Sequence, residues 1–249
     1  MQLRTGPYQG RLVVALCFFD HFPEIYPPYR GDWYPISRSG VLYSDTGGRT
    51  WEAGGHTQVN MTDNEAAISE LADGTLVLNS RNYLGTSHYG TIRPYGQSDY
   101  GEGYNYSTHP PHRGLSFSTD SGATFSDTYH PPALEGPTCE GAQLTGWDTP
   151  TELGIAGNQT LFFTNPAATF ERANLTMKMS VDGGCEWSEV ARVNTGTSMY
   201  SSIVQFADGA IGVAFDDGSD IHCPPKSAYG CGSNNETFKL IELSKAAPE

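Results

Sequence analysis

The sequence is poor in charged residues and lacks runs of strong helix formers. Charged residues account for 17% of its 249 positions, whereas it contains 29 glycines and 16 prolines. Glycine and proline interrupt helices, so this composition excludes a mainly helical fold. No stretch of about 18 apolar residues occurs, and we therefore predict no membrane-spanning helix.

Basic residues and cysteines are also scarce. The 14 Lys and Arg face 28 Asp and Glu, a net charge of −14, which argues against nucleic acid as a partner because phosphate contacts need basic patches. A small anionic ligand is still compatible, since arginines in a cleft act locally. The five cysteines show no CxxC or Cys/His metal spacing, so we expect neither a metal nor a cofactor. Cys223 and Cys231 flank a short loop and either pair or stay reduced.

Asn-x-Ser/Thr sequons suggest a cellular location. Five of them favour the secretory pathway, with a lysosomal or extracellular destination. They begin at Asn60, Asn105, Asn158, Asn174 and Asn235.

A turn motif recurs between the short Val, Ile, Phe and Tyr runs that predict an all-β protein. Its copies are Ser44–Trp51, Ser118–Phe125 and Ser180–Trp187, all close to Ser-x-Asp-x-Gly-x-Thr-Trp. We expect the Asp to accept hydrogen bonds from turn amides, Gly to supply a positive φ and the aromatic ring to pack beneath the turn. Thr46 replaces the Asp in the first copy and weakens it.

A longer repeat aligns 64–81 with 199–216 without gaps. Each copy reads as strand, Asp-Gly turn and strand. If each turn is centred between Asp and Gly, Arg81 returns to the level of Glu65, and Asp216 returns beside Tyr200. These four side chains then lie at the open ends of their hairpins.

Repeated strand units with a turn motif in each predict a β-propeller of about four blades. The whole chain, 1–249, reads as one such domain. Two insertions, Phe19–Tyr34 and Asn82–His112, are rich in Pro, Gly and aromatic residues, and we expect them to form long surface loops.

Several segments resemble the sialidase (neuraminidase) family, and in particular its lysosomal-type animal members and their bacterial relatives. The turn motifs resemble the Asp-boxes, or BNR repeats, of that family. The resemblance implies a six-bladed propeller of which about four blades are present. The segments that carry it are Asn64-Glu65 with Arg81, Thr164–Ala167 with Arg172–Thr176, Tyr200–Ser202, and Gln2-Leu3 with Gly10–Val14.

By this resemblance the chain derives from an exo-α-sialidase, a retaining glycoside hydrolase that releases terminal sialic acid from glycoproteins, oligosaccharides or glycolipids such as gangliosides. Tyr200 is then the nucleophile and Glu65 its base, while Arg81 and Arg172 bind the substrate carboxylate. Asp216 stands where the family usually has a Glu that braces an arginine. The residue types suit the chemistry, because a carboxylate nucleophile would meet repulsion from the sialic acid carboxylate.

The family pattern is not complete in this sequence. Its first arginine and its acid/base aspartate find no match, so we expect a domain that is incomplete at the N-terminus and weakly active or inactive by itself. Asp20, Asp32 and Asp99 are expected to lie in loops, where aspartates usually form turns. The alternatives are a non-catalytic propeller that binds sialic acid and a scaffold with no sugar site.

Overall fold

The computed structural model describes residues 1–20, 36–57, 63–82, 112–147, 159–168, 171–218 and 235–243. These residues form twelve β-strands and no α-helix, so the all-β prediction is confirmed. In the same ranges no helix is long and apolar enough to cross a membrane.

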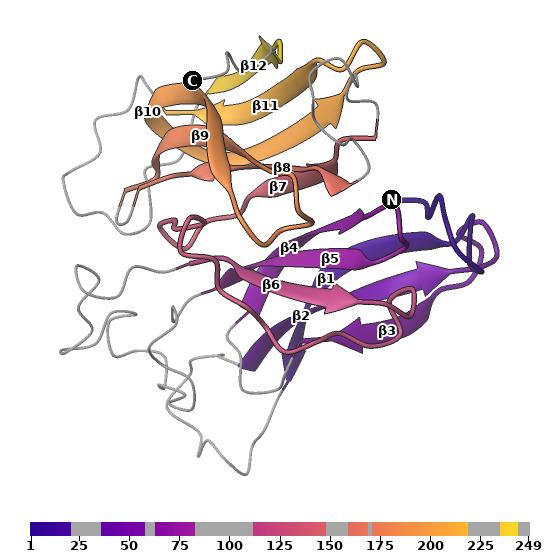
Figure 1. Ribbon diagram of the computed structural model, residues 1–249. Helices are drawn as coiled ribbons and strands as arrows, with labels where there is room; N and C mark the ends of the chain where they lie inside the picture. The colour runs from indigo at the N-terminus through magenta and orange to yellow at the C-terminus, as the bar shows by residue number, and fades with distance from the viewer. Residues whose placement is uncertain are drawn as a thin grey trace, which may run out of the picture.

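The strands pair antiparallel in three sheets (Figure 1). They are β1 (Leu12–Asp20), β2 (Ile36–Ser44), β3 (Glu52–His56), β4 (Asp63–Glu70), β5 (Leu76–Asn82), β6 (Gly114–Ser118), β7 (Ala142–Thr145), β8 (Leu161–Pro166), β9 (Ala173–Ser180), β10 (Ser188–Gln205), β11 (Ile211–Asp217) and β12 (Asn235–Ile241). The sheet orders are β1-β2-β3, β4-β5-β6 and β12-β11-β10-β9-β8-β7.

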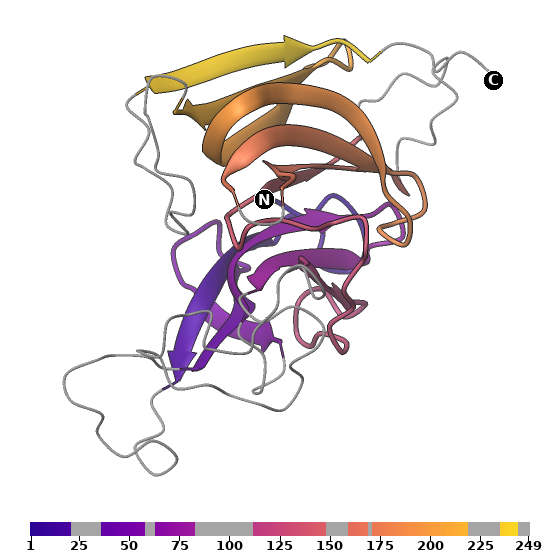
Figure 2. The same cartoon turned by 90° about the vertical axis from the view of Figure 1, so that its left-hand side faces the viewer.

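The six-stranded sheet consists of two blades that share the 18-residue strand β10. The first half of β10, from Ser188 to Thr197, pairs with β9, and the second half, from Ser198 to Gln205, pairs with β11. Figure 2 shows the strong curl of this sheet. Counting the halves of β10 separately gives four successive blades, which agrees with the predicted partial propeller.

Buried apolar side chains fill the three interfaces between successive blades. Because side chains alternate along a strand, Leu76 and Leu78 pack toward the first blade while Val77 packs toward the third. In the same way Phe162 of the third blade faces the fourth blade, and Phe163 faces the second blade. The clusters are Leu3, Val13, Val41, Leu76 and Leu78; then Leu71, Val77, Leu115, Leu134, Leu161 and Phe163; then Phe162, Leu175, Met177, Val193, Ile211, Val213 and Phe215.

The three turn motifs share the predicted hydrogen bond. Asp120 Oδ1 accepts the N–H of the residue four positions later at 2.8 Å, and Asp182 Oδ1 does so at 3.0 Å. In the first copy the Thr46 hydroxyl takes this place, at 2.9 Å. The aromatic rings of the second and third copies pack against the blade cores. Trp51 also contacts its own turn, since its indole N–H donates to Gly48 O at 3.1 Å. Its ring is nevertheless 42% exposed, because the first turn has no further blade above it among the described residues.

The two insertions lie almost entirely outside the described residues, and so do Asp32 and Asp99. The loop prediction for Asp20 is wrong, because β1 continues through Asp20 and pairs it with Ile36 of β2. The continuous apolar run of β1, from Leu12 to Phe19, extends the strand further than the aromatic-rich segment suggested.

Candidate active site

Two hairpins of identical design supply the candidate residues. In β4–β5 and in the second half of β10 with β11, Gly74 and Gly209 follow the turn Asp with φ of 85° and 87°. Their N–H groups donate to Leu71 O and Phe206 O, both at 2.9 Å. A positive φ is accessible to glycine without strain, so the Asp-Gly sequence sets both turns and thereby both registers.

Both hairpins also contain an irregularity at their open ends. The register shifts between Asp63 and Ala66 in β4, and between Ser198 and Ser201 in β10, at equivalent positions of the repeat. Glu65 and Tyr200 fall inside these shifts. A bulge redirects side chains away from the regular pleat, which explains how two strands of different blades turn these residues toward each other.

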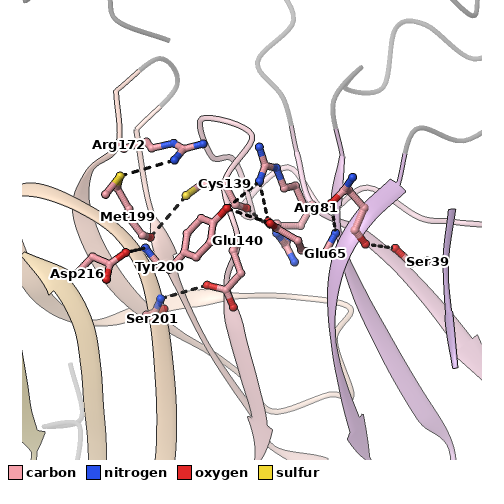
Figure 3. A network of polar contacts seen from close by, with 12 residues as sticks. Ser39, Glu65, Arg81, Cys139, Glu140, Arg172, Met199, Tyr200, Ser201 and Asp216 are labelled. Carbon is pink, nitrogen blue, oxygen red and sulfur yellow. Dashed lines mark hydrogen bonds and ion pairs between the residues drawn. The ribbon is translucent and has the colours of Figure 1, made fainter. Parts of the chain in front are cut away.

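Glu65, Arg81 and Tyr200 meet at these open ends (Figure 3). The Tyr200 hydroxyl donates to Glu65 Oε1 at 2.9 Å, across 135 residues of sequence. Arg81 Nη1 lies 2.6 Å from Glu65 Oε2 and 3.4 Å from the Tyr200 oxygen. Arg81 therefore does return to the level of Glu65, as the turn position predicted, and it is 7% exposed whereas Tyr200 is 40% exposed.

The surroundings keep the Tyr200 phenol protonated. Burial raises the pKa of Tyr200, and the charge and hydrogen bond of Glu65 raise it further, whereas Arg81 lowers it. The geometry is that of a neutral phenol whose proton already points at a carboxylate. Such a pair can pass a proton to Glu65 when the phenol oxygen forms a new bond.

Arg172, which immediately precedes β9, stands on the other side of the Tyr200 ring. Its guanidinium carbon lies 5.9 Å from the ring centroid, and its Nη1 contacts Met199 Sδ at 3.7 Å. Its Nε is buried and has no hydrogen-bond partner in the described part of the chain. A guanidinium held by a weak acceptor retains donors for a ligand carboxylate.

Asp216 contacts the Tyr200 backbone. Its Oδ2 accepts the Tyr200 N–H at 3.3 Å, so the predicted position beside Tyr200 is found. Among the described residues its hydrogen bond goes to this strand and to no arginine. On the neighbouring blade, Thr164 Oγ1 lies 2.9 Å from Ser201 Oγ, which joins the Thr164–Ala167 segment to the Tyr200 segment.

The sequence reading missed Cys139, Glu140 and Arg113. Glu140 Oε2 accepts the Ser201 N–H at 3.1 Å, and the Cys139 thiol donates to Met199 O at 3.6 Å. Burial raises the pKa of Glu140. An acidic residue directly before the Gly141 that leads into β7 was the available indication, but no repeat or turn motif marked it.

The described residues offer no cluster of three His, Cys, Asp or Glu side chains suited to a metal ion. Cys17, Cys139 and Cys185 are free thiols. The suggested Cys223–Cys231 pair lies outside the described residues.

Two curated proteins are similar in sequence to this chain. One is a sialidase of Micromonospora viridifaciens, 28% identical over 222 residues that cover 89% of this chain and 28% of the relative. The other is a sialidase of Bacteroides fragilis (strain YCH46), 26% identical over 66% of this chain and 25% of the relative. The chain thus spans about a quarter of the length of either relative. No protein-family model matches it.

Solved structures share its fold. The Hadza microbial sialidase Hz136 matches 94% of this chain and 35% of its own with a TM-score of 0.63 at 23% identity. The intramolecular trans-sialidase from Ruminococcus gnavus, solved with oseltamivir carboxylate, matches 100% of this chain and 44% of its own with a TM-score of 0.64 at 19% identity. In sequence the chain therefore resembles the sialidase family, and in fold it is a partial β-propeller of the sialidase type.

Proposed function

We propose that this chain carries the nucleophile, the base and two carboxylate-binding arginines of an exo-α-sialidase with a retaining mechanism. The observation that carries the proposal is the hydrogen bond from the Tyr200 hydroxyl to Glu65, made beside Arg81. A tyrosine that is 40% exposed on a strand needs no such partners for packing. A carboxylate, a phenol and a guanidinium within hydrogen-bond reach form the set that a tyrosine nucleophile requires.

The first step forms a bond between Tyr200 and the sugar. The phenol oxygen attacks the anomeric carbon of sialic acid as its proton passes to Glu65 Oε1, and the glycosidic bond breaks with its electron pair on the aglycone oxygen. A free phenolate at a pH of about 5 would cost roughly 7 kcal/mol at 1.36 kcal/mol per pKa unit. The Glu65 contact removes that cost by accepting the proton during attack.

The second step restores the enzyme. Water attacks the same carbon, the bond to Tyr200 breaks, and the proton held by Glu65 returns to the phenol oxygen. The attacking water gives up one proton to solvent, which balances the proton that the departing aglycone oxygen takes up from solvent. Two displacements at one carbon leave its configuration unchanged. A neutral tyrosine suits this substrate because it meets no charge repulsion from the adjacent carboxylate.

Arg81 and Arg172 hold the substrate carboxylate in this proposal. They lie at the phenol oxygen and over the ring of Tyr200, respectively. Guanidinium groups bind carboxylates through paired hydrogen bonds, so the sugar would be anchored with its anomeric carbon near the phenol. The donors on Arg172 described above are available for this purpose.

The proposal leaves the general acid unassigned. We therefore expect this chain by itself to cleave natural sialosides weakly, since a positioned acid contributes typically 10²–10⁴-fold. Aryl leaving groups depart with less help from an acid, so aryl sialosides should be the better substrates. Glycoproteins, oligosaccharides and glycolipids such as gangliosides are the proposed natural sources of sialic acid.

The test measures turnover of an aryl sialoside and, separately, binding of sialic acid. Tyr200→Phe should lower the turnover by about 10²- to 10⁴-fold and leave the binding of sialic acid unchanged. Glu65→Gln should behave likewise. NMR of the first product should show retained configuration. Equal turnover in Tyr200→Phe and the parent chain would overturn the assignment. Binding without any turnover in the parent chain would instead favour a non-catalytic sialic-acid-binding propeller.

A further inference from the structure

The backbone on both sides of Tyr200 is held by side chains instead of by a neighbouring strand. In an extended strand, the carbonyl of one residue and the N–H of the residue two positions later point to the same edge. Met199 O and Ser201 N are such a pair. The Cys139 thiol donates to Met199 O at 3.6 Å, and the Ser201 N–H donates to Glu140 Oε2 at 3.1 Å.

The opposite edge of the same segment is held in a similar way. The register shift between Ser198 and Ser201 takes Tyr200 out of regular pairing with β11. Asp216 then accepts its N–H at 3.3 Å. The two peptide groups that flank Tyr200 are thus fixed by three side chains.

The Cys139–Glu140 pair is itself anchored to the blade that carries Arg81. Arg113 Nη1 donates to Cys139 O at 2.8 Å. Its Nε and Nη2 donate to the side-chain and backbone oxygens of Asn79, both at 2.8 Å. Asn79 lies on β5 two residues before Arg81, and Asn79, Arg113 and Cys139 are 0%, 3% and 3% exposed.

A continuous buried bridge therefore runs from β5 to the strand of Tyr200. Glu65 and Arg81 belong to the second blade and Tyr200 to the fourth, so no local structure sets the distance between them. We infer that Cys139 and Glu140 are positioning residues, which hold the peptide groups flanking Tyr200 and thereby direct its phenol to Glu65. This inference rests on the proposed function for its catalytic meaning, but its geometry can be tested without any activity.

Pairs of matched variants separate hydrogen bonding from charge and volume. Glu140→Gln keeps an oxygen that accepts the Ser201 N–H, whereas Glu140→Leu removes it, and both remove the same charge. Cys139→Ser keeps a donor for Met199 O, and Cys139→Ala does not.

The first readout is the phenol of Tyr200 itself. Tyrosine ring carbons are labelled with ¹³C, and the Tyr200 resonance among the 14 tyrosines is identified by its loss in Tyr200→Phe. We expect the pKa of Tyr200 in Glu140→Gln to stay above that in Glu140→Leu, where the phenol leaves Glu65 for water. Identical titrations of the two variants would overturn the inference.

The second readout needs no variant and so does not depend on whether a variant folds. Ser201 pairs with Phe215 in the β10–β11 ladder, but its N–H donates to the Glu140 carboxylate, so this contact should protect it from hydrogen exchange. We expect it to exchange as slowly as the ladder amides of β10, and exchange at the rate of a free amide would refute the contact.

Turnover of the aryl sialoside is the third readout, where the chain has activity. Glu140→Leu should lower kcat by about 10²-fold, the typical effect of a displacement of about 1 Å, while KM stays within about threefold. Glu140→Gln should retain kcat within about threefold. An equal loss in both would contradict the inference, and absence of turnover in the parent chain would count against the proposed function alone.

Discussion

Asp63 provides a direct test of the electrostatics at the base of the site. It begins β4, is 0% exposed, and receives the Asn82 side-chain N–H at 3.1 Å. Burial raises the pKa of Asp63 to about 6, and hydrogen bonds from Thr57 and Asn82 and the charge of Arg113 offset only part of this effect. At neutral pH the fold therefore holds a buried carboxylate that would be more favourable in water.

The sign of the effect on stability follows from the two protonation equilibria. The unfolded chain has the ordinary aspartate pKa of 3.8, so between about pH 4 and pH 6 the native state binds more protons than the unfolded state. Stability from this group is fully present below the lower value and is lost as pH rises through the higher one. A gap of roughly two pKa units at 1.36 kcal/mol each amounts to about 3 kcal/mol.

Replacing Asp63 by Asn removes this dependence. The amide resembles the protonated acid in shape and carries no charge, so Asp63→Asn should match the parent chain near pH 4. It should exceed the parent in free energy of unfolding by up to about 3 kcal/mol at pH 8. Urea unfolding at several pH values between 4 and 8 measures the difference directly.

Asp45 supplies the control, because its hydrogen bond with Arg11 lowers the pKa of this exposed carboxyl. Asp45→Asn should be less stable than the parent by a nearly constant amount between pH 4 and pH 8, and this difference should shrink only as pH falls below the ordinary aspartate pKa of 3.8. A difference between Asp63→Asn and the parent chain that is the same at pH 4 and pH 8 would show that Asp63 does not titrate as described.

Further predictions concern binding and packing. Arg172→Ala should weaken binding of sialic acid by about 10-fold or more in calorimetry, because a charge-assisted pair is lost; unchanged affinity would remove Arg172 from the site. Arg113→Met should lower the free energy of unfolding by about 3 kcal/mol, since buried carbonyls lose their donor, and Arg113→Lys should lose less. Gly141→Ala places a Cβ 2.5 Å from the Phe163 ring and should cost about 1–3 kcal/mol. Gly212→Ala meets only exposed rings and should cost less; the reverse order would contradict the packing.

Much of the fold was predictable because its determinants are local. The Asp-Gly turns at Gly74 and Gly209 fix the two hairpins through a positive φ, and the alternation of apolar residues fixes which face is buried. These two facts are enough to predict from the sequence that Arg81 approaches Glu65. The exposed ring of Trp51 was not predictable, because its exposure depends on what lies above the turn.

The sequence by itself determined the strands, the turns and the pairing within each hairpin, since these depend on residues close together in the chain. Only the tertiary structure decided that the open ends of two hairpins 135 residues apart meet, with Tyr200 donating to Glu65. It also decided that Cys139 and Glu140, from the blade between them, reach the backbone of β10. The physical reason is that blades stack face to face through their apolar cores, and the spacing set by that packing, which no local pattern encodes, determines which polar side chains can touch.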